Sequence, residues 1–196
     1  MDRAETGGVH PFEFVIAFFS FIYALALTHL LLSITAIIRH RRIVVFSLPQ
    51  ALWMLAALVS LIANWISLWD FHNLQTITLG TIFVGFVLSV LQYLVCALVS
   101  PELRDGSDLR AYNVQQGRAY IGAFAALVIC SLFANVIAGS SLGIQNWALE
   151  NTLVLSMVPA VSLPLIIRKP WLDAVCAFTM SALGVLFLLV YYQVLK

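Results

Sequence analysis

The stretch FVIAFFSFIYALALTHLLLSITAII, residues 14–38, contains no charged side chain. A helix rises about 1.5 Å per residue, so a helix over this stretch would exceed the roughly 30 Å of a membrane's hydrocarbon core. Inside lipid, backbone polar groups have no water to bond, and a crossing segment must therefore satisfy its own hydrogen bonds as a helix. The stretch predicts a transmembrane helix.

The rest of the chain repeats this pattern. Five further stretches lack Asp, Glu, Lys and Arg: 43–69, 71–101, 119–149, 151–167 and 174–195. Hydrophobic residues make up 62% of the 196 positions and charged residues only 10%, whereas soluble domains are roughly 45–50% apolar. The mean hydropathy is +1.00. This composition excludes a water-soluble fold.

We expect an all-α, polytopic integral membrane protein in which residues 1–196 form a single domain. The expected architecture is a bundle of six transmembrane helices with short loops. The expected spans cover residues 12–38, 49–69, 76–100, 119–138, 147–167 and 171–193, with boundaries accurate to about 2–4 residues. In the longest loop, Ser107 or Asp108 is expected to cap a helix that continues into the fourth span.

The distribution of positive charge predicts the orientation. Arg3 and Lys196 fall on one side of the expected bundle, and the other eight basic residues fall on the opposite side: Arg39, Arg41, Arg42, Arg104, Arg110, Arg118, Arg168 and Lys169. Positively charged loops stay on the cytoplasmic side. We therefore expect a multi-pass protein of the inner or plasma membrane, with both termini periplasmic or extracellular. The first apolar run is too long for a signal-peptide core, so it is expected to remain in the mature protein.

Small side chains at helical spacing predict where helices pack together. In lipid, helices associate through close contact of small residues and through interhelical hydrogen bonds. The fourth span carries small residues every four positions, and the second span carries a similar stripe. These residues are Gly122, Ala126, Cys130 and Ala134 in the fourth span, and Ala56, Ser60, Ala63 and Ser67 in the second. We interpret both stripes as packing faces.

Two prolines, Pro159 and Pro164, interrupt the fifth span. Each removes an amide donor and clashes with the carbonyl four residues earlier, so we expect a kink or two half-helices. Broken helices often line transport sites, but proline is also common in ordinary membrane helices. Both interpretations remain open.

Four strongly polar side chains lie deep in the spans: His29, Asn64, Gln92 and Asn135, with Thr28 beside the first. By their distance from the span midpoints, His29 and Gln92 share one depth, and Asn64 and Asn135 share another. We expect His29 to pair with Gln92, and Asn64 with Asn135. One interpretation is interhelical hydrogen bonding alone. The other is a polar path in which His29 relays protons, since imidazole titrates near neutral pH.

Several kinds of chemistry find no support. Proton-coupled transporters usually carry a charged residue within the membrane, and none lies deep in these spans. The histidines His10, His29, His40 and His72 fall at depths that do not suit paired haem ligation, and Asp70 with His72 is interpreted as an exposed loop pair. The three cysteines lie in apolar spans without metal-binding spacing. We expect no catalytic residues, cofactor or metal, and the net charge of +1 gives no reason to expect nucleic acid.

Two functional classes therefore remain, and a membrane enzyme is a third with little support. The first class is a small oligomeric channel or facilitator for an ion, a proton or a small neutral solute. The second is an accessory or structural subunit of a larger membrane complex. The expected partners are the lipid bilayer and either further copies of the chain or another membrane protein. A channel predicts a water-accessible path past His29 or Asn64, whereas a subunit predicts solid packing and a small-residue face turned to lipid.

Overall fold

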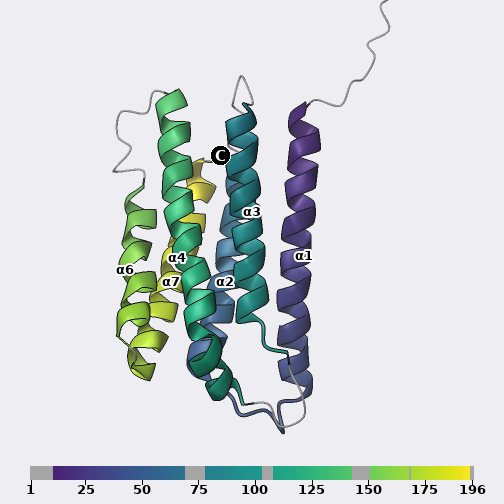
Figure 1. The fold of residues 1–196 in the computed structure, drawn as a ribbon, viewed down its shortest axis with the longest axis vertical. Coiled ribbons are helices and arrows are strands. Elements are labelled where there is room, and N and C mark those ends of the chain that lie inside the picture. The colour runs from purple at the N-terminus through teal and green to yellow at the C-terminus, as the bar shows by residue number, and fades with distance from the viewer. Residues whose placement is uncertain (1–10, 69–77, 103–107, 143–150, 168, 195–196) are drawn as a thin grey trace, which may run out of the picture.

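A computed structural model describes residues 11–68, 78–102, 108–142, 151–167 and 169–194 of the chain (Figure 1). These residues form six helices and no strand. The helices are α1 (Pro11–Arg39), α2 (Leu48–Ser67), α3 (Leu79–Val99), α4 (Leu109–Leu142), α6 (Thr152–Ile166) and α7 (Pro170–Val194). By length and composition, α1, α2, α3, α4 and α7 can each cross a membrane. The all-helical membrane fold expected from the sequence is therefore confirmed at this level.

The shortest helix is α6, with 15 residues. At about 1.5 Å per residue it extends roughly 22 Å, less than a hydrocarbon core. The expected fifth span began at residue 147, but residues 147–150 lie outside the described part of the chain, and the helix begins after Asn151. Pro159 and Pro164 both lie inside this single helix, so the expectation of two half-helices is wrong; the kink stays a prediction.

The longest helix is α4, with 34 residues, and it extends beyond the expected span of 119–138 towards its N-terminus. The Asp108 carboxylate accepts hydrogen bonds from the amides of Arg110 at 2.8 Å and Ala111 at 3.4 Å. This confirms the expectation of a capped helix that continues from the loop into the membrane span. The amide of Leu109 also donates to the carbonyl of Val45 at 3.1 Å, which ties this loop to the one between α1 and α2.

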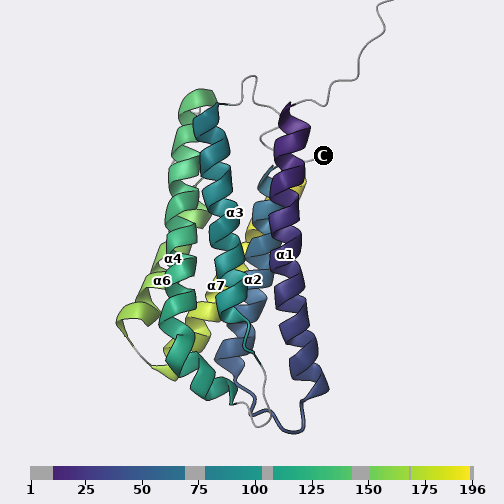
Figure 2. The ribbon, with the colours of Figure 1, turned by 45° about the vertical axis from the view of Figure 1, so that its right-hand side comes forward.

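Five helices form a ring and the sixth packs against its outside. Around the ring, α2 contacts α7, α7 contacts α6, α6 contacts α4, α4 contacts α3, and α3 contacts α2. The first helix, α1, packs on α3 and α2 alone among the described helices and stands at the edge of the bundle in Figures 1 and 2. Across the ring, α2 and α4 also contact each other.

The two ends of the bundle differ in charge. The C-terminal end of α1 with Arg39–Arg42, the first turn of α4 with Arg110, and Lys169 before α7 lie at one end of the bundle, which we call the arginine end. The first residue of α1 and the last residue of α7 lie at the opposite end, the terminal end (Figure 1). Both described chain ends thus lie on one side, as expected. Which side of the membrane each end faces stays a prediction.

Close helix contact occurs at two glycines outside the expected ridge. A methyl group added at Gly184 of α7 would lie 2.6 Å from Val59 Cγ1 of α2, and one added at Gly85 of α3 would lie 2.7 Å from the Phe19 ring of α1. At Gly122 the same methyl would meet nothing within 4 Å. The close approach expected at Gly122 is therefore absent, because no atom of a neighbouring helix lies where its side chain would be.

Candidate functional site

A cavity of about 190 Å³ lies inside the ring, in the half nearer the terminal end. All five helices of the ring contribute to its lining, and five of the lining side chains are polar. These are Ser60, Asn64 and Ser67 from α2, and Ser131 and Asn135 from α4. Among the described residues that line it, none is charged. We call this space the terminal-end cavity.

The spacing of small residues explains why a space remains here. The whole stripe expected on the second span, from Ala56 to Ser67, faces this cavity. Residues three and four apart share one face of a helix, and side chains this small leave room between helices. On α4, Ala134 reaches the cavity while Gly122 faces open space. In a helix of 3.6 residues per turn, residues four apart are rotated about the helix axis by about 40° per step, so a ridge with this spacing cannot stay on one face. Ala126 and Cys130, which lie between Gly122 and Ala134 on this ridge, are half-buried.

Gln92 anchors the polar network beside the cavity. It is fully buried on α3. Its Oε1 accepts a hydrogen bond from Asn64 Nδ2 at 2.9 Å, and its Nε2 donates to Ser60 Oγ at 3.2 Å. Asn64 thus joins Gln92 to the cavity wall, because it lines the cavity and donates to the buried amide. Among the described residues, no hydrogen bond to Asn64 Oδ1 or to the Ser131 hydroxyl is formed, and both groups line the cavity.

The expected pairing of His29 with Gln92 is wrong. His29 and Thr28 are both exposed on the outer surface of α1. The Thr28 hydroxyl donates to its own helix, to Ala24 O at 2.8 Å, and the His29 ring lies edge-on to the Tyr93 ring with centroids 6.2 Å apart. Matching depth was not sufficient, because the buried face of α1 is formed by other residues: Phe19, Tyr23, Ala26, Leu30 and Ser33.

Asn64 and Asn135 also differ from their expected pairing. Asn135 Nδ2 donates a short hydrogen bond to Asn151 Oδ1 at the start of α6, while Asn64 donates to Gln92. Both asparagines nevertheless line the same cavity. The sequence did not identify their partners, and it placed Asn64 in a different layer from Gln92, to which Asn64 donates a hydrogen bond.

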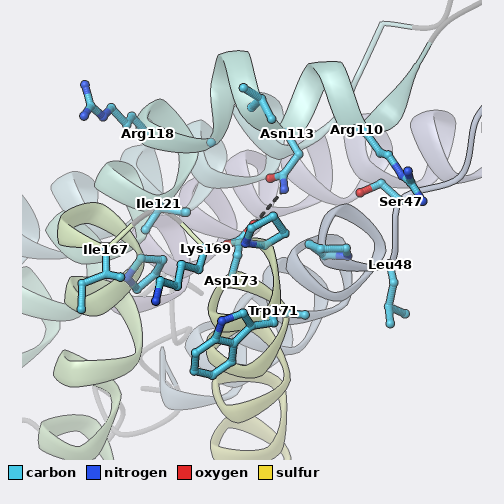
Figure 3. Close-up of a pocket in the computed structure, with 16 residues that line it drawn as sticks. Ser47, Leu48, Arg110, Asn113, Arg118, Ile121, Ile167, Lys169, Trp171 and Asp173 are labelled. Carbon is cyan, nitrogen blue, oxygen red and sulfur yellow. Dashed lines mark hydrogen bonds between the residues drawn. The ribbon is translucent and has the colours of Figure 1, made fainter.

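A second, larger pocket of about 770 Å³ lies at the arginine end, and we call it the arginine-end pocket (Figure 3). It is formed by the first residues of α2, α4 and α7 and the last residues of α6. Its charged residues are Arg110, Arg118, Lys169 and Asp173. Pro164 is buried and lines this pocket, whereas Pro159 is exposed. The two prolines therefore lie on different faces of α6.

Asp173 is a site residue that the sequence analysis missed. Its carboxylate accepts hydrogen bonds from Trp53 Nε1 of α2 and Asn113 Nδ2 of α4, both at 2.7 Å. The hydroxyl of Tyr120 in turn donates to Asn113 Oδ1. The polar residues predicted to matter all lie within uncharged stretches, whereas Asp173 directly precedes the last such stretch, residues 174–195. Its position two residues after Trp171, inside the expected sixth span, is the sequence feature that could have indicated a buried carboxylate.

A buried aromatic layer separates the two spaces. Trp53, Tyr120 and Phe124 are all fully buried, with Trp53 5.3 Å from Phe124 and 6.0 Å from Tyr120 between ring centroids. Along α2, Pro49 lines the arginine-end pocket and Ala56 the terminal-end cavity, so the layer is roughly 10 Å thick at about 1.5 Å per residue. We call these three residues the aromatic layer.

The arrangement suits the binding of small neutral molecules more than it suits bond-breaking chemistry. Hydroxyl and amide groups of the terminal-end cavity can donate and accept hydrogen bonds but do not change charge near neutral pH. Within the described ranges, no group of three or more His, Cys, Asp or Glu side chains could hold a metal ion. Comparisons of the chain with protein-family models, with curated proteins and with solved structures find no match.

Proposed function

We propose that this membrane protein is a facilitator that passes a small uncharged polar solute through the five-helix ring. The observation that carries the proposal is a polar cavity lined by all five helices of the ring, with a second pocket towards the arginine end lined by α2, α4, α6 and α7. Along α2 the buried Trp53 lies between Pro49, which lines the pocket, and Ala56, which lines the cavity. Two spaces separated by a short buried layer along the same helix are what a closed permeation path would require.

The lining favours a neutral solute over an ion. A charge transferred into a space walled by apolar side chains, hydroxyls and amides loses much of its hydration, which costs several kcal/mol. A small polar molecule would instead exchange its water hydrogen bonds for those of Asn64, Ser67 and Ser131. A cavity of about 190 Å³ has room for about six water molecules at their liquid volume of roughly 30 Å³ each. Such a volume suits a solute of a few heavy atoms.

The aromatic layer would act as the gate. The hydrogen bonds of Asp173 to Trp53 and Asn113 hold the layer to α7 and α4. Opening would require the Trp53 indole to move away from the centre of the five-helix ring, which breaks its hydrogen bond to Asp173. Small movements of packed helices that take microseconds to milliseconds are a common way for membrane proteins to open such a path.

Solute flux into liposomes tests the proposal. Purified protein would be reconstituted, and vesicle shrinkage and recovery would be followed by light scattering with glycerol, urea and water as probes. We expect flux above that of empty vesicles for at least one probe, a rise with Trp53→Ala, and a fall with Asn64→Leu. His29→Ala is the matched control, since His29 lies on the outer surface and should leave flux unchanged. If neither the native protein nor Trp53→Ala exceeds empty vesicles for any probe, the proposal is wrong.

A second candidate function, the accessory subunit, is favoured by one observation on α1. The small residues Ala17, Ala24 and Thr28 are exposed on this helix, with His29 beside them. A polar imidazole facing lipid is unfavourable, and small-residue faces are typical of helix contacts in membranes. Another membrane helix covering this face would satisfy both. Cross-linking through Ala24→Cys in native membranes would test it, and capture of a different membrane protein together with no solute flux would favour this function.

A further inference from the structure

The arginine-end pocket holds an excess of positive charge that the proposed permeation path does not use. Its lining contains three cationic side chains, Arg110, Arg118 and Lys169, against one carboxylate, Asp173. Both carboxylate oxygens already accept hydrogen bonds from Trp53 and Asn113. The hydrogen-bonding capacity of Asp173 is therefore used within the protein, and the lining retains a net charge of +2, from three cations and one carboxylate.

The cations come from two places along the chain, the start of α4 and the residue before α7. Arg110 and Arg118 come from the first turns of α4, and Lys169 directly precedes α7. Figure 3 shows Arg110 and Arg118 on opposite sides of the hydrogen-bonded pair Asn113 and Asp173. A ligand that neutralises them must therefore carry its negative charge at the mouth of the pocket and not at its floor.

The rest of the pocket is apolar, and much of this apolar surface is exposed. Val114 is 71% exposed and Trp171 is 63% exposed, and Leu48 and Ile167 are exposed as well. Behind them Ile121 and Pro164 are buried and form part of the floor. A pocket with a cationic mouth and apolar walls that continue onto the outer surface matches an amphiphile: a negative headgroup with hydrocarbon chains.

The position of the pocket identifies the source of that amphiphile. It lies where α2 and α7 begin and α6 ends, so its mouth is at the level where apolar spans give way to polar connections. In a bilayer this level holds the lipid headgroups, and Trp171 is a residue type enriched there. Basic pockets between transmembrane helices commonly bind anionic headgroups. A volume of about 770 Å³ falls within the roughly 300–1,000 Å³ of small-molecule sites.

We propose that the arginine-end pocket binds one anionic phospholipid, with its negative headgroup attracted by the surrounding cations Arg110, Arg118 and Lys169 and its chains lying against Val114, Ile167 and Trp171. A free phosphate ion offers the same charge but gains nothing from the apolar wall. The bound lipid would link the start of α4 to the connection between α6 and α7. It would do so next to Asp173, which contacts the aromatic layer through Trp53.

Native mass spectrometry of the purified full chain tests this proposal. The protein would be incubated in detergent with phosphatidylglycerol or with phosphatidylcholine carrying the same acyl chains, and the fraction with one lipid retained would be measured. We expect preferential retention of one phosphatidylglycerol. The triple variant R110Q/R118Q/K169Q should weaken its binding about tenfold or more, since each basic residue near a headgroup contributes on the order of 1 kcal/mol, a figure that corresponds to about fivefold.

A matched control separates a specific site from general attraction to a basic surface. The variant R39Q/R41Q/R42Q removes the same number of charges from the same end of the bundle, outside the pocket, and should leave the retention of phosphatidylglycerol within about twofold of native. Equal losses in the two variants, or equal retention of both lipids by the native protein, would overturn the proposal. If the pocket variant fails to fold, R118Q against R42Q makes the same comparison with one charge each.

Inorganic phosphate distinguishes the two sources of the anion. Millimolar phosphate should leave the retained phosphatidylglycerol in place, because it cannot replace the contacts of the acyl chains with Val114, Ile167 and Trp171. Displacement of the lipid by phosphate would show that the site takes a soluble anion, and the lipid proposal would then be wrong.

Discussion

At the scale of single residues, Gln92 and His29 show what depth alone can and cannot predict. Both were placed in one layer from their positions along their spans. Gln92 is fully buried and bonds to α2, while His29 is exposed on α1. A helix residue is defined by its height and by its rotation about the axis. The span midpoints gave only a coarse height, since they placed Asn64 in a different layer from Gln92 although the two side chains are hydrogen-bonded. The rotation is decided by the contacts of neighbouring helices.

The two side chains should therefore respond differently to the same substitution. Gln92→Leu leaves the Asn64 amide without its acceptor and should lower the stability of the protein in detergent by about 0.6–1.7 kcal/mol, the range measured for hydrogen bonds between membrane helices. His29→Leu should have little effect or a small stabilising one, because it removes a polar group from the outer surface. Thermal unfolding of both variants measures this difference. A larger loss for His29→Leu would contradict the buried network described for Gln92.

Asp173 is the second residue with a clear expected effect. Asp173→Asn keeps the shape of the side chain but removes the negative charge that receives two hydrogen bonds. Hydrogen bonds to charged groups contribute roughly 1.5–3 kcal/mol, so a loss of about that size is expected. Glu102→Gln is the control, because Glu102 is an exposed carboxylate near the same end of the bundle. Equal unfolding temperatures for the two variants would show that the bonds to Trp53 and Asn113 contribute nothing to stability.

At the scale of elements, the small-residue stripes of α2 and α4 show how helix geometry decides a role. The stripe on α2 alternates four-residue and three-residue steps and stays on the face of the cavity, whereas the strict four-residue ridge of α4 winds from Gly122 on an open face to Ala134 at the cavity. The average step of the α2 stripe is close to the 3.6 residues of one helical turn. Its pattern was therefore the better guide to a single face.

Among the described glycines, Gly184 of α7 is the one where an added methyl would come nearest to another helix, α2. Gly184→Ala places a methyl 2.6 Å from Val59 Cγ1, and overpacking of this kind costs about 1–3 kcal/mol. Adding Val59→Ala should restore most of the stability because it removes the atoms that clash. Gly122→Ala should be tolerated, since its methyl meets no atom within 4 Å. Thermal unfolding of the three variants gives the comparison. If Val59→Ala does not restore the stability of Gly184→Ala, the loss does not come from this contact.

At the scale of the whole molecule, the ring with α1 outside it gives the protein its interior. The ring pairs helices distant in sequence, such as α2 with α7. Along α2, Pro49 lines the arginine-end pocket, Trp53 belongs to the aromatic layer and Ala56 lines the terminal-end cavity. The segregation of the arginines at one end agrees with the expected topology.

Cysteine labelling measures the orientation of the whole molecule. In a background with Cys96, Cys130 and Cys176 replaced by alanine, Arg42→Cys at the arginine end should be protected in intact cells from a membrane-impermeant maleimide. Glu13→Cys at the terminal end should be labelled. The reason is the positive-inside rule, which keeps basic loops cytoplasmic. Labelling of Arg42→Cys but not of Glu13→Cys would show that the protein has the opposite orientation, with the proposed lipid site in the outer leaflet.

The sequence by itself determined that this chain is a helical protein with helices apolar enough to cross a membrane, and which of the connections between them carry the positive charge. These properties follow from the hydropathy and charge of contiguous residues, and lipid requires each crossing segment to satisfy its own backbone hydrogen bonds. Only the tertiary structure decided that Asn64 bonds to Gln92, that His29 faces outwards, and that Asp173 joins Trp53 to Asn113. The physical reason is that side-chain partners depend on how each helix is rotated about its axis. That rotation is set by packing between helices far apart in the chain.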